Sequence, residues 1–204
     1  MAKKASLSAT ITTRDRILLA AMVRFSRQSY DETRLRDIAA DVGVDAAYVH
    51  RLFGSKRQLF AEVIGRAVEA DAFLDEISTD LVGVLTHRAV TPENSGRGHD
   101  VDPLDIAVHS ISSVEAAEVH RDFLNRDVIE PLALQLKAPG PHRAALIAAF
   151  LTGLNILRNV IGIKELQGAE RSALDPLIRS AFEVLVNEPV AARPKTKSEG
   201  SRRR

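Results

Sequence analysis

Four side chains between positions 48 and 56 could bind an acidic partner. Tyr48, His50 and Arg51 fall within one predicted helical turn, and Lys56 follows five residues later. They supply a phenol, an imidazole and two cations, all of which can donate hydrogen bonds to phosphate oxygens or to base edges. The chemistry that this group suggests is the binding of a polyanion.

The sequence offers little for catalysis. Its six histidines include no pair at the i, i+4 spacing of a helical metal site. Cysteine is absent, which excludes disulfides, thiolate metal sites and a cysteine nucleophile. No phosphate-loop pattern occurs, no serine lies in a nucleophile-elbow context, and "GRG" at 96–98 lacks the flanking strand of a nucleotide-binding fold. We therefore expect no enzymatic activity, no metal and no cofactor.

Charge is distributed unevenly along a chain whose overall net charge is only +1. Residues 1–60 carry eleven Lys/Arg and six Asp/Glu, a net charge of +5. Residues 61–187 carry a net charge of −8, and residues 188–204 a net charge of +4. A basic N-terminal unit on an acidic body favours a polyanion partner for that unit alone. An incidental excess of surface charge is the alternative, and charge by itself does not decide between the two.

Apolar periodicity predicts the helices that would position these side chains. Helices are expected from residue 13 to Phe25, from Leu35 to Val42 and from Asp45 to Phe53, with a fourth that begins at Lys56 and continues into the 70s. Thr33 and Asp45 are expected to cap the second and third of them. The third is too short to be stable alone, so its neighbours must hold it in place.

The rest of the chain also indicates helices, and no strand alternation stands out. Boundaries are predicted at a loop over 86–103 that ends in Asp102-Pro103, at Ser112, at Pro131, at the break over 138–141, and around a last helix over 171–186. Residues 142–161 form an apolar run with small residues, but no run reaches the ~20 residues of a membrane span. We predict an all-α protein of about nine helices, cytoplasmic and without a membrane partner.

Ala39, Gly43 and Val49 have the spacing of a helix-turn-helix. The alanine lets the two helices approach closely, the glycine accepts the left-handed backbone of the turn, and the valine packs inward to set the crossing angle. This arrangement would brace the short helix so that its N-terminal half can enter a DNA major groove. The predicted partner is double-stranded DNA.

With these residues in place, the chain resembles the tetracycline-repressor family of bacterial transcriptional regulators. The resemblance rests on Phe25, Tyr30, Thr33, Ile38-Ala39, Gly43-Val44, Phe53 and Ser55-Lys56, and more loosely on "GLNILRNVIGIKEL" at 153–166. It implies a basic arm over 1–12, a three-helix DNA-binding domain over 13–60, a helical effector-binding and dimerisation domain over 61–187, and a basic tail over 188–204. It also implies a homodimer that acts as a ligand-responsive repressor at a palindromic operator.

One set of residues is predicted to face the DNA. Its members are Thr33, Arg36, Ala46, Ala47, Tyr48, His50, Arg51 and Lys56. Tyr48 is the candidate for base edges, the two alanines for thymine methyl groups, and Lys56, at a helix N-terminus, for a phosphate. Lys3, Lys4 and Arg14 could follow the minor groove or the backbone. For Arg36 and Arg51, a solvated charge with no DNA role stays open as the alternative.

The body of the chain would then bind an effector and dimerise. Polar residues set among apolar ones could line a pocket, or could be satisfied structural groups; they are His109, Asn155, Arg158 and Asn159. Ala148 and Leu151 mark the candidate dimer interface. The alternative function is a helix-turn-helix protein without a small-molecule effector, controlled by a protein partner or acting architecturally. A pocket of several hundred Å³ would favour the effector, whose identity the sequence does not indicate.

Overall fold

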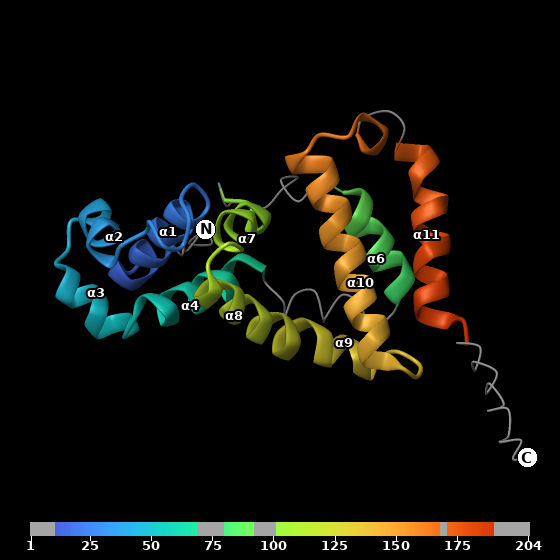
Figure 1. The fold of residues 1–204 in the computed structure, drawn as a ribbon, viewed down its shortest axis with the longest axis horizontal. Coiled ribbons are helices and arrows are strands. Elements are labelled where there is room, and N and C mark those ends of the chain that lie inside the picture. Colours follow the sequence, from blue (N-terminus) through green and yellow to red (C-terminus); the bar gives the residue numbers. More distant parts are fainter. Residues whose placement is uncertain (1–10, 69–79, 92–100, 168–170, 190–204) are drawn as a thin grey trace, which may run out of the picture.

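The computed structural model describes residues 11–68, 80–91, 101–167 and 171–189, and every regular element within these ranges is helical. The helices form two hydrophobic clusters, one toward each end of the molecule (Figure 1). The predicted all-α fold is confirmed. None of the described helices is long and apolar enough to cross a membrane.

The N-terminal bundle, here called the head, consists of α1 (Thr13–Phe25), α2 (Leu35–Val42), α3 (Ala46–Phe53) and α4 (Lys56–Val68). Three fully buried rings form its centre, where Phe60 meets Phe25 and Tyr30 edge-on with ring centroids 4.8 and 4.9 Å apart. Such aromatic pairs contribute about 0.5–1.5 kcal/mol beyond their area burial. They hold α4 against α1. α4 also runs through the predicted domain boundary at residue 60.

A side chain caps the start of α1, whereas no side chain caps the start of α2. Thr12 and Asp15 form a reciprocal capping box at the start of α1, as its threonine-rich beginning predicts. The predicted cap of α2 is wrong, because Arg34 occupies the N-cap position and Thr33 lies one residue earlier. The Thr33 hydroxyl donates instead to the carbonyl of Ser29 at 3.0 Å, which stabilises the turn that leads into α2.

A continuous run of helical turns joins the head to the far end of the molecule (Figure 1). It begins as α8 (Val114–Phe123), passes through the π-helical segment η1 (Leu124–Ile129), and ends as α9 (Glu130–Leu134). α8 packs against α4, and η1 packs against α10. The run stays helical through Pro131, where the π-helical turns of η1 give way to the α9 segment that contains this proline. The kink or split expected at this proline stays a prediction.

The second cluster, here called the body core, lies between α6 (Leu81–Val90), α10 (Gly140–Asn155) and α11 (Arg171–Asn187). Each of these helices contributes a fully buried residue, namely Leu85, Ile147 and Phe182. α7 (Pro103–Ser110) packs on the head instead, and short segments η2 (Ile156–Val160) and η3 (Lys164–Leu166) follow α10.

Most predicted boundaries in the body are confirmed, with two differences. α7 begins at Pro103 behind the capping side chain of Asp102, and α10 begins inside the predicted break over 138–141. The predicted loop over 86–103 starts too early, because α6 continues to Val90, where burial of its apolar face keeps the chain helical. Ser113 rather than Ser112 occupies the N-cap position of α8, and it makes no side-chain capping bond there.

Two buried arginines lie at helix C-termini in the body core. Arg143 of α10 donates to the carbonyl oxygens of Val184 and Leu185, at 3.2 and 2.5 Å, in the last turn of α11. Arg158 donates at 2.5 Å to the carbonyl of Ala89, in the last turn of α6. Carbonyl groups at a helix C-terminus carry partial negative charge and have no partner within the helix, so a guanidinium satisfies both needs.

Candidate nucleic-acid interface and ligand pocket

The turn between α2 and α3 has the geometry that its sequence predicts. Gly43 ends α2 in the left-handed conformation, with φ at 73°, and the amide of Val44 donates to the carbonyl of Ala39 at 3.0 Å. Ala39 and Val49 are buried between the two helices. These contacts fix the angle at which α3 leaves α2, as a helix-turn-helix requires.

The first turn of α3 presents mostly small side chains. Asp45 caps the helix, its carboxylate accepting the amide of Ala47 at 2.6 Å. Ala47 is exposed, whereas Ala46 and Tyr48 are half-buried and pack against the head core. The phenol of Tyr48 is thereby held in a restricted position, which a residue that reads base edges needs.

The remaining predicted contacts on α2 and α3 are exposed. His50 and Arg51 lie on the outer face of α3, and the Arg51 guanidinium is 5.7 Å from the centre of the Tyr48 ring. Arg36 lies on the outer face of α2 with its guanidinium 3.7 Å from the carboxylate of Asp37. Their exposure leaves these side chains available to a DNA duplex.

Lys56 has an additional role within the head. Its ammonium donates to the carbonyl of Tyr30 at 3.0 Å and lies 4.2 Å from the centre of the Tyr30 ring. An ammonium has three donors, so the remaining ones can still reach a phosphate. Lys56 therefore ties the start of α4 to the loop before α2.

Two of the predicted DNA contacts are used inside the protein. Thr33 is fully buried, so its side chain presents no surface to DNA in this structure. Arg14 belongs to α1, pairs with Glu62 of α4 at 2.5 Å, and lies over the Phe53 ring at 4.8 Å. It is therefore part of the head's packing rather than of a basic arm. Lys3 and Lys4 lie outside the described residues.

An ion pair holds α2 on α1. The guanidinium of Arg24 donates to the Asp41 carboxylate at 2.5 and 2.8 Å. This bidentate bond lowers the pKa of Asp41 and raises that of Arg24. Arg16 adds a bond of 2.9 Å to the carbonyl of Val42, at the end of α2. These bonds and the packing of α1 against α2 support the helix-turn-helix from α1.

Polar contacts also connect the head to the body, and the sequence did not predict them. Arg57 of α4 lies 2.9 Å from the carboxylate of Glu118 and 3.6 Å from that of Asp122, both on α8. The hydroxyl of Ser113 donates to the carboxylate of Asp31 at 3.0 Å. The head and α8 are joined by charge as well as by apolar packing.

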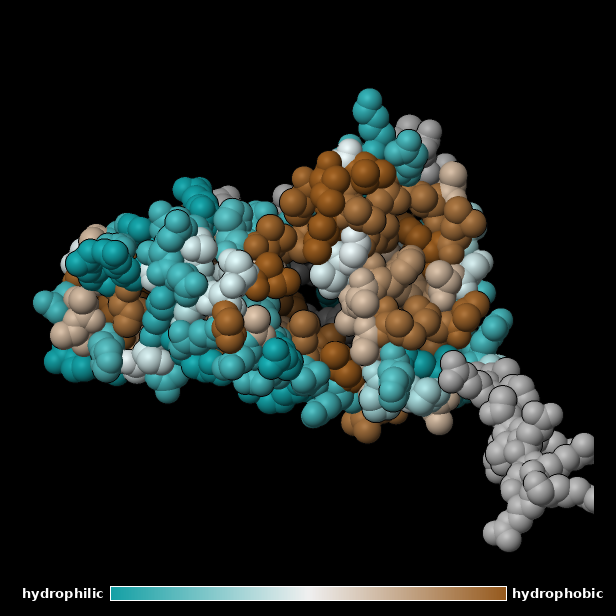
Figure 2. Space-filling view, in the orientation of Figure 1, coloured by the Kyte–Doolittle hydropathy of each residue, from teal (hydrophilic) through white to brown (hydrophobic). Residues whose placement is uncertain are grey.

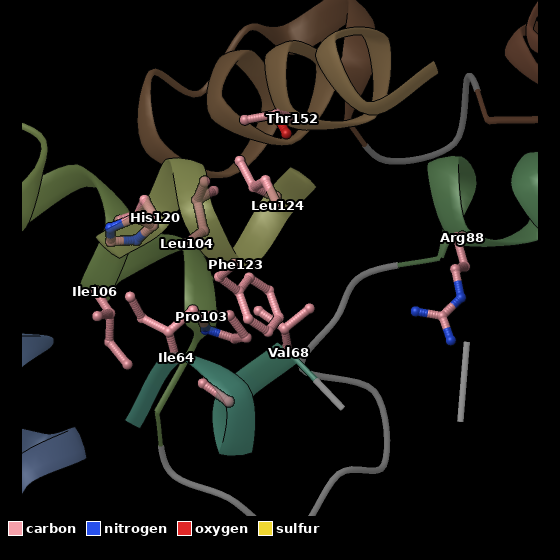
Figure 3. A pocket seen from close by; sticks show the side chains of 12 residues that line it. Ile64, Val68, Arg88, Pro103, Leu104, Ile106, His120, Phe123, Leu124 and Thr152 are labelled. Atoms are coloured by element: carbon pink, nitrogen blue, oxygen red, sulfur yellow. The ribbon is translucent and has the colours of Figure 1, made fainter. Parts of the chain in front are cut away.

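A pocket of about 210 Å³ lies beside this joint (Figure 3). α4, α7, α8 and α10 form its walls, and α6 contributes one arginine. The described lining residues are Ile64, Ala67, Val68, Arg88, Pro103, Leu104, Ile106, Ala107, His120, Phe123, Leu124 and Thr152. In Figure 3, Thr152 of α10 lies across the pocket from Ile64 and Val68, while Arg88 stands apart at one edge.

None of the four predicted pocket residues is among these lining residues. His109 is exposed on α7, and its Nδ1 bonds the carbonyl of Asp105 at 2.8 Å. Asn155 and Asn159 each accept a hydrogen bond from the guanidinium of Arg158, at 2.5 and 3.1 Å. Each of these four side chains thus has a hydrogen bond within the protein, as the structural alternative that the sequence left open would require.

The two residues predicted for the dimer interface are not fully exposed to solvent. Leu151 is half-buried and packs on the body core of its own chain, and Ala148 is half-buried as well. Exposed apolar side chains lie next to them on the same helix and its continuation, and also on α11. We call this set the apolar face; its members are Leu146, Phe150, Leu157, Val160, Ile161, Leu177 and Val184. Figure 2 shows apolar side chains gathered over α10, while the head is mostly hydrophilic on this side.

His120 is the residue of the pocket that sequence reasoning missed. A signal for it exists, since His120 is four residues after buried Ala116 and three before buried Phe123, on the apolar side of a predicted helix. Its ring also meets Phe60 of the head edge-on, with centroids 5.4 Å apart. No group of three or more potential metal ligands is found in the described part of the chain.

The all-helical fold, the braced α2–α3 pair and the separate body define a helix-turn-helix regulator. Residues 17–63 match the family model described as bacterial regulatory proteins of the tetR family. Residues 85–186 match the model described as the tetracyclin repressor-like C-terminal domain. The chain belongs to the tetracycline-repressor family, and it is a DNA-binding transcriptional regulator. A comparison with curated proteins gave no match.

Three solved structures share this architecture. A TetR-family regulator of Streptomyces coelicolor A3 is 24% identical, with a TM-score of 0.56, over 86% of this chain and 95% of that one. NalD of Pseudomonas aeruginosa, the secondary repressor of the MexAB-OprM multidrug efflux pump, is 18% identical, with a TM-score of 0.59, over 86% and 97%. A transcriptional regulator of Saccharomonospora viridis, solved with choline, is 20% identical, with a TM-score of 0.58, over 86% and 98%. Identities this low establish the shared fold alone.

Proposed function

We propose that this regulator is a homodimeric repressor that binds a palindromic operator and releases it when a small molecule occupies the pocket. The observation that supports this most directly is the position of α4. Ile64, Ala67 and Val68 of this helix line the pocket, and Lys56 stands at its other end, beside the recognition helix α3. A ligand that favours a different position of α4 would shift the equilibrium between head positions.

The apolar face supports the homodimer. Leu146 and Ile161 are 57% and 60% exposed, on one helix and its continuation, and Leu177 on α11 is 68% exposed. Contiguous exposed apolar side chains mark an interaction surface. A single recognition helix reads few base pairs, whereas a two-fold dimer doubles the contacts and matches a palindrome. Acting on bacterial chromosomal DNA, such a dimer would work in the cytoplasm.

The similar structures support repression and ligand response without naming the ligand. NalD is a repressor, and the Saccharomonospora viridis regulator was solved with choline. The described lining of the pocket here contains no carboxylate and a single benzene ring, that of Phe123. A quaternary ammonium is held by a cage of aromatic rings or by negative charge, so a choline-like effector is not expected. At about 210 Å³ the pocket is smaller than the several hundred Å³ expected of an effector site, so control by a protein partner stays the alternative.

Genome-wide footprinting of the full-length protein tests the DNA-binding part of the proposal. We expect protected sites that share a palindrome, with half-sites spaced by whole helical turns. Sites without two-fold symmetry would contradict the dimeric operator. The genes beside the protected sites would also suggest the chemistry of the effector.

Two variants test whether α3 reads the bases of the operator while α4 binds its phosphates. Tyr48→Ala should change the preferred base at one or two positions, each by about 1–3 kcal/mol. Lys56→Ala should weaken binding to all sequences similarly and reduce the slope of log affinity against log salt by about one. Lys56→Arg keeps the charge and is the matched control. A binding profile unchanged in Tyr48→Ala, or a salt slope unchanged in Lys56→Ala, would contradict the assigned role.

A further inference from the structure

We propose that the pocket binds a small uncharged hydroxy compound, of about the size of a substituted phenol, whose hydroxyl donates a hydrogen bond to Nε2 of His120. That such a ligand weakens operator binding rests on the proposed function, whereas the binding of the ligand to the protein is argued from the pocket alone.

The size and lining of the pocket set the first limit on the ligand. An apolar cavity of about 150 Å³ is sufficient for benzene, and this pocket offers about 210 Å³. Nine of the twelve described lining residues are apolar, and Phe123 supplies a benzene ring. The body of the ligand is therefore apolar, with room for a ring and a short substituent.

The tautomer of His120 determines which polar group the ligand carries. Nδ1 of His120 lies 3.1 Å from the carbonyl of Ala116, one turn earlier on α8. A carbonyl oxygen only accepts, so Nδ1 must carry the proton. Burial lowers the pKa of His120, which favours the neutral ring. In the neutral ring Nε2 then holds a lone pair and is an acceptor.

Nε2 is the atom of His120 left for the ligand, because His120 lines the pocket and Nδ1 is bonded to the backbone. Nδ1 faces the backbone of α8, so Nε2, at the other end of the ring, faces away from it. Within the described residues, Nε2 has no hydrogen-bond partner. A hydroxyl that enters the pocket can donate to it, and Thr152 on α10 offers a second polar group on another wall. Because the ring also packs on Phe60, the ligand would bind to a side chain that the head core touches directly.

Charge excludes one class of ligand. The described lining of the pocket contains neither Asp nor Glu. A buried cation without a carboxylate partner loses its hydration and gains no compensating charge. The ligand must therefore donate a hydrogen bond to His120 and carry no positive charge. Phenols do both, since they donate a hydrogen bond and stay un-ionised near neutral pH.

The test compares three ligands of one shape by isothermal titration calorimetry on the full-length protein without DNA. These are 4-ethylphenol, 4-ethyltoluene, in which a methyl replaces the hydroxyl, and tyramine, which adds an ammonium to the ethyl end. We expect 4-ethylphenol to bind about tenfold more tightly than 4-ethyltoluene, the effect of one hydrogen bond in an apolar site. Tyramine should bind at least tenfold more weakly than 4-ethylphenol.

Two histidine variants complete the test. His120→Phe keeps a ring but removes the acceptor, so the two neutral ligands should bind equally. His109→Phe is the matched control, because His109 makes the same bond to a carbonyl one turn earlier but lies outside the pocket. It should keep the preference. Equal binding of the neutral ligands to the wild type, a preference that survives His120→Phe, or no binding of 4-ethylphenol at millimolar concentration would overturn the proposal. Footprinting without ligand is unaffected by any of these results, so failure here leaves the proposed DNA binding standing.

Discussion

The guanidinium of Arg57 lies 2.9 Å from the carboxylate of Glu118, and this pair joins the helix that ends the head to the helix that begins the connection to the body. Both side chains are more than one third exposed, so water screens the attraction. The pair therefore contributes little to overall stability. Its position matters more, because it spans the joint beside the pocket.

A double-mutant cycle measures this pair. Arg57→Ala, Glu118→Ala and the double variant should give a coupling free energy of about 0.5 kcal/mol from urea unfolding at low salt. The coupling should fall in 1 M NaCl, where the Debye length is only about 3 Å. The exposed pair Arg36–Asp37, at 3.7 Å, is the control and should show almost no coupling. No coupling between Arg57 and Glu118 at low salt would contradict the structure of the joint.

The structure needs glycine at position 43 because of its backbone conformation, not because a side chain would lack room there. A Cβ built on Gly43 would meet no atom within 4 Å, yet its φ of 73° strains any L-residue with a side chain. Gly43→Ala should lower the free energy of unfolding by about 1–2 kcal/mol. Gly65→Ala is the control: this glycine lies inside α4 and is equally open, so alanine should stabilise the helix by about 0.5–1 kcal/mol. Equal effects at the two sites, measured by urea unfolding, would show that the turn is not strained.

The apolar face should hold the dimer. Leu146→Glu should produce a monomer at micromolar concentration in sedimentation velocity, with an unchanged circular dichroism spectrum and much weaker operator binding. Leu134→Glu is the control, because Leu134 is 89% exposed on α9 and lies outside the apolar face. Leu151 is unsuitable for this test, since it packs on the body core of its own chain. A wild-type monomer, or a dimeric Leu146→Glu, would contradict the assignment.

The neutral state of His120 gives stability a defined dependence on pH. Burial lowers the pKa of His120 in the folded chain below its usual value of 6.5, so the unfolded chain binds the proton more readily. Stability contributed by this residue is then present above pH 6.5 and is lost as the pH falls below it. The unfolding midpoint of the wild type should drop more between pH 7.5 and 5.5 than that of His120→Phe, in which the other histidines still titrate. An equal drop in the unfolding midpoint of the two proteins would mean that burial does not lower the pKa of His120.

Local features were predictable from the sequence because they depend on residues close together in the chain. Gly43 ends α2 where a glycine with free φ was expected, and Asp45 caps α3 through the amide two residues later. Apolar periodicity likewise predicted the helices α1 to α4. The cap of α2 was wrong by one position, because Thr33 instead bonds the carbonyl of Ser29 in a turn with no periodic signal.

The sequence by itself therefore determined the all-α class and the helix-turn-helix, through interactions that span one or two helical turns. Only the tertiary structure decided which polar groups of the body face a cavity. Arg158 bonds the carbonyl of Ala89, 69 residues away in sequence, while His120 lines the pocket because α8 packs against α4. Arg57 and Glu118 are 61 residues apart and become partners in the same way. Such pairings depend on the packing of whole helices, and no spacing within a single helix records them.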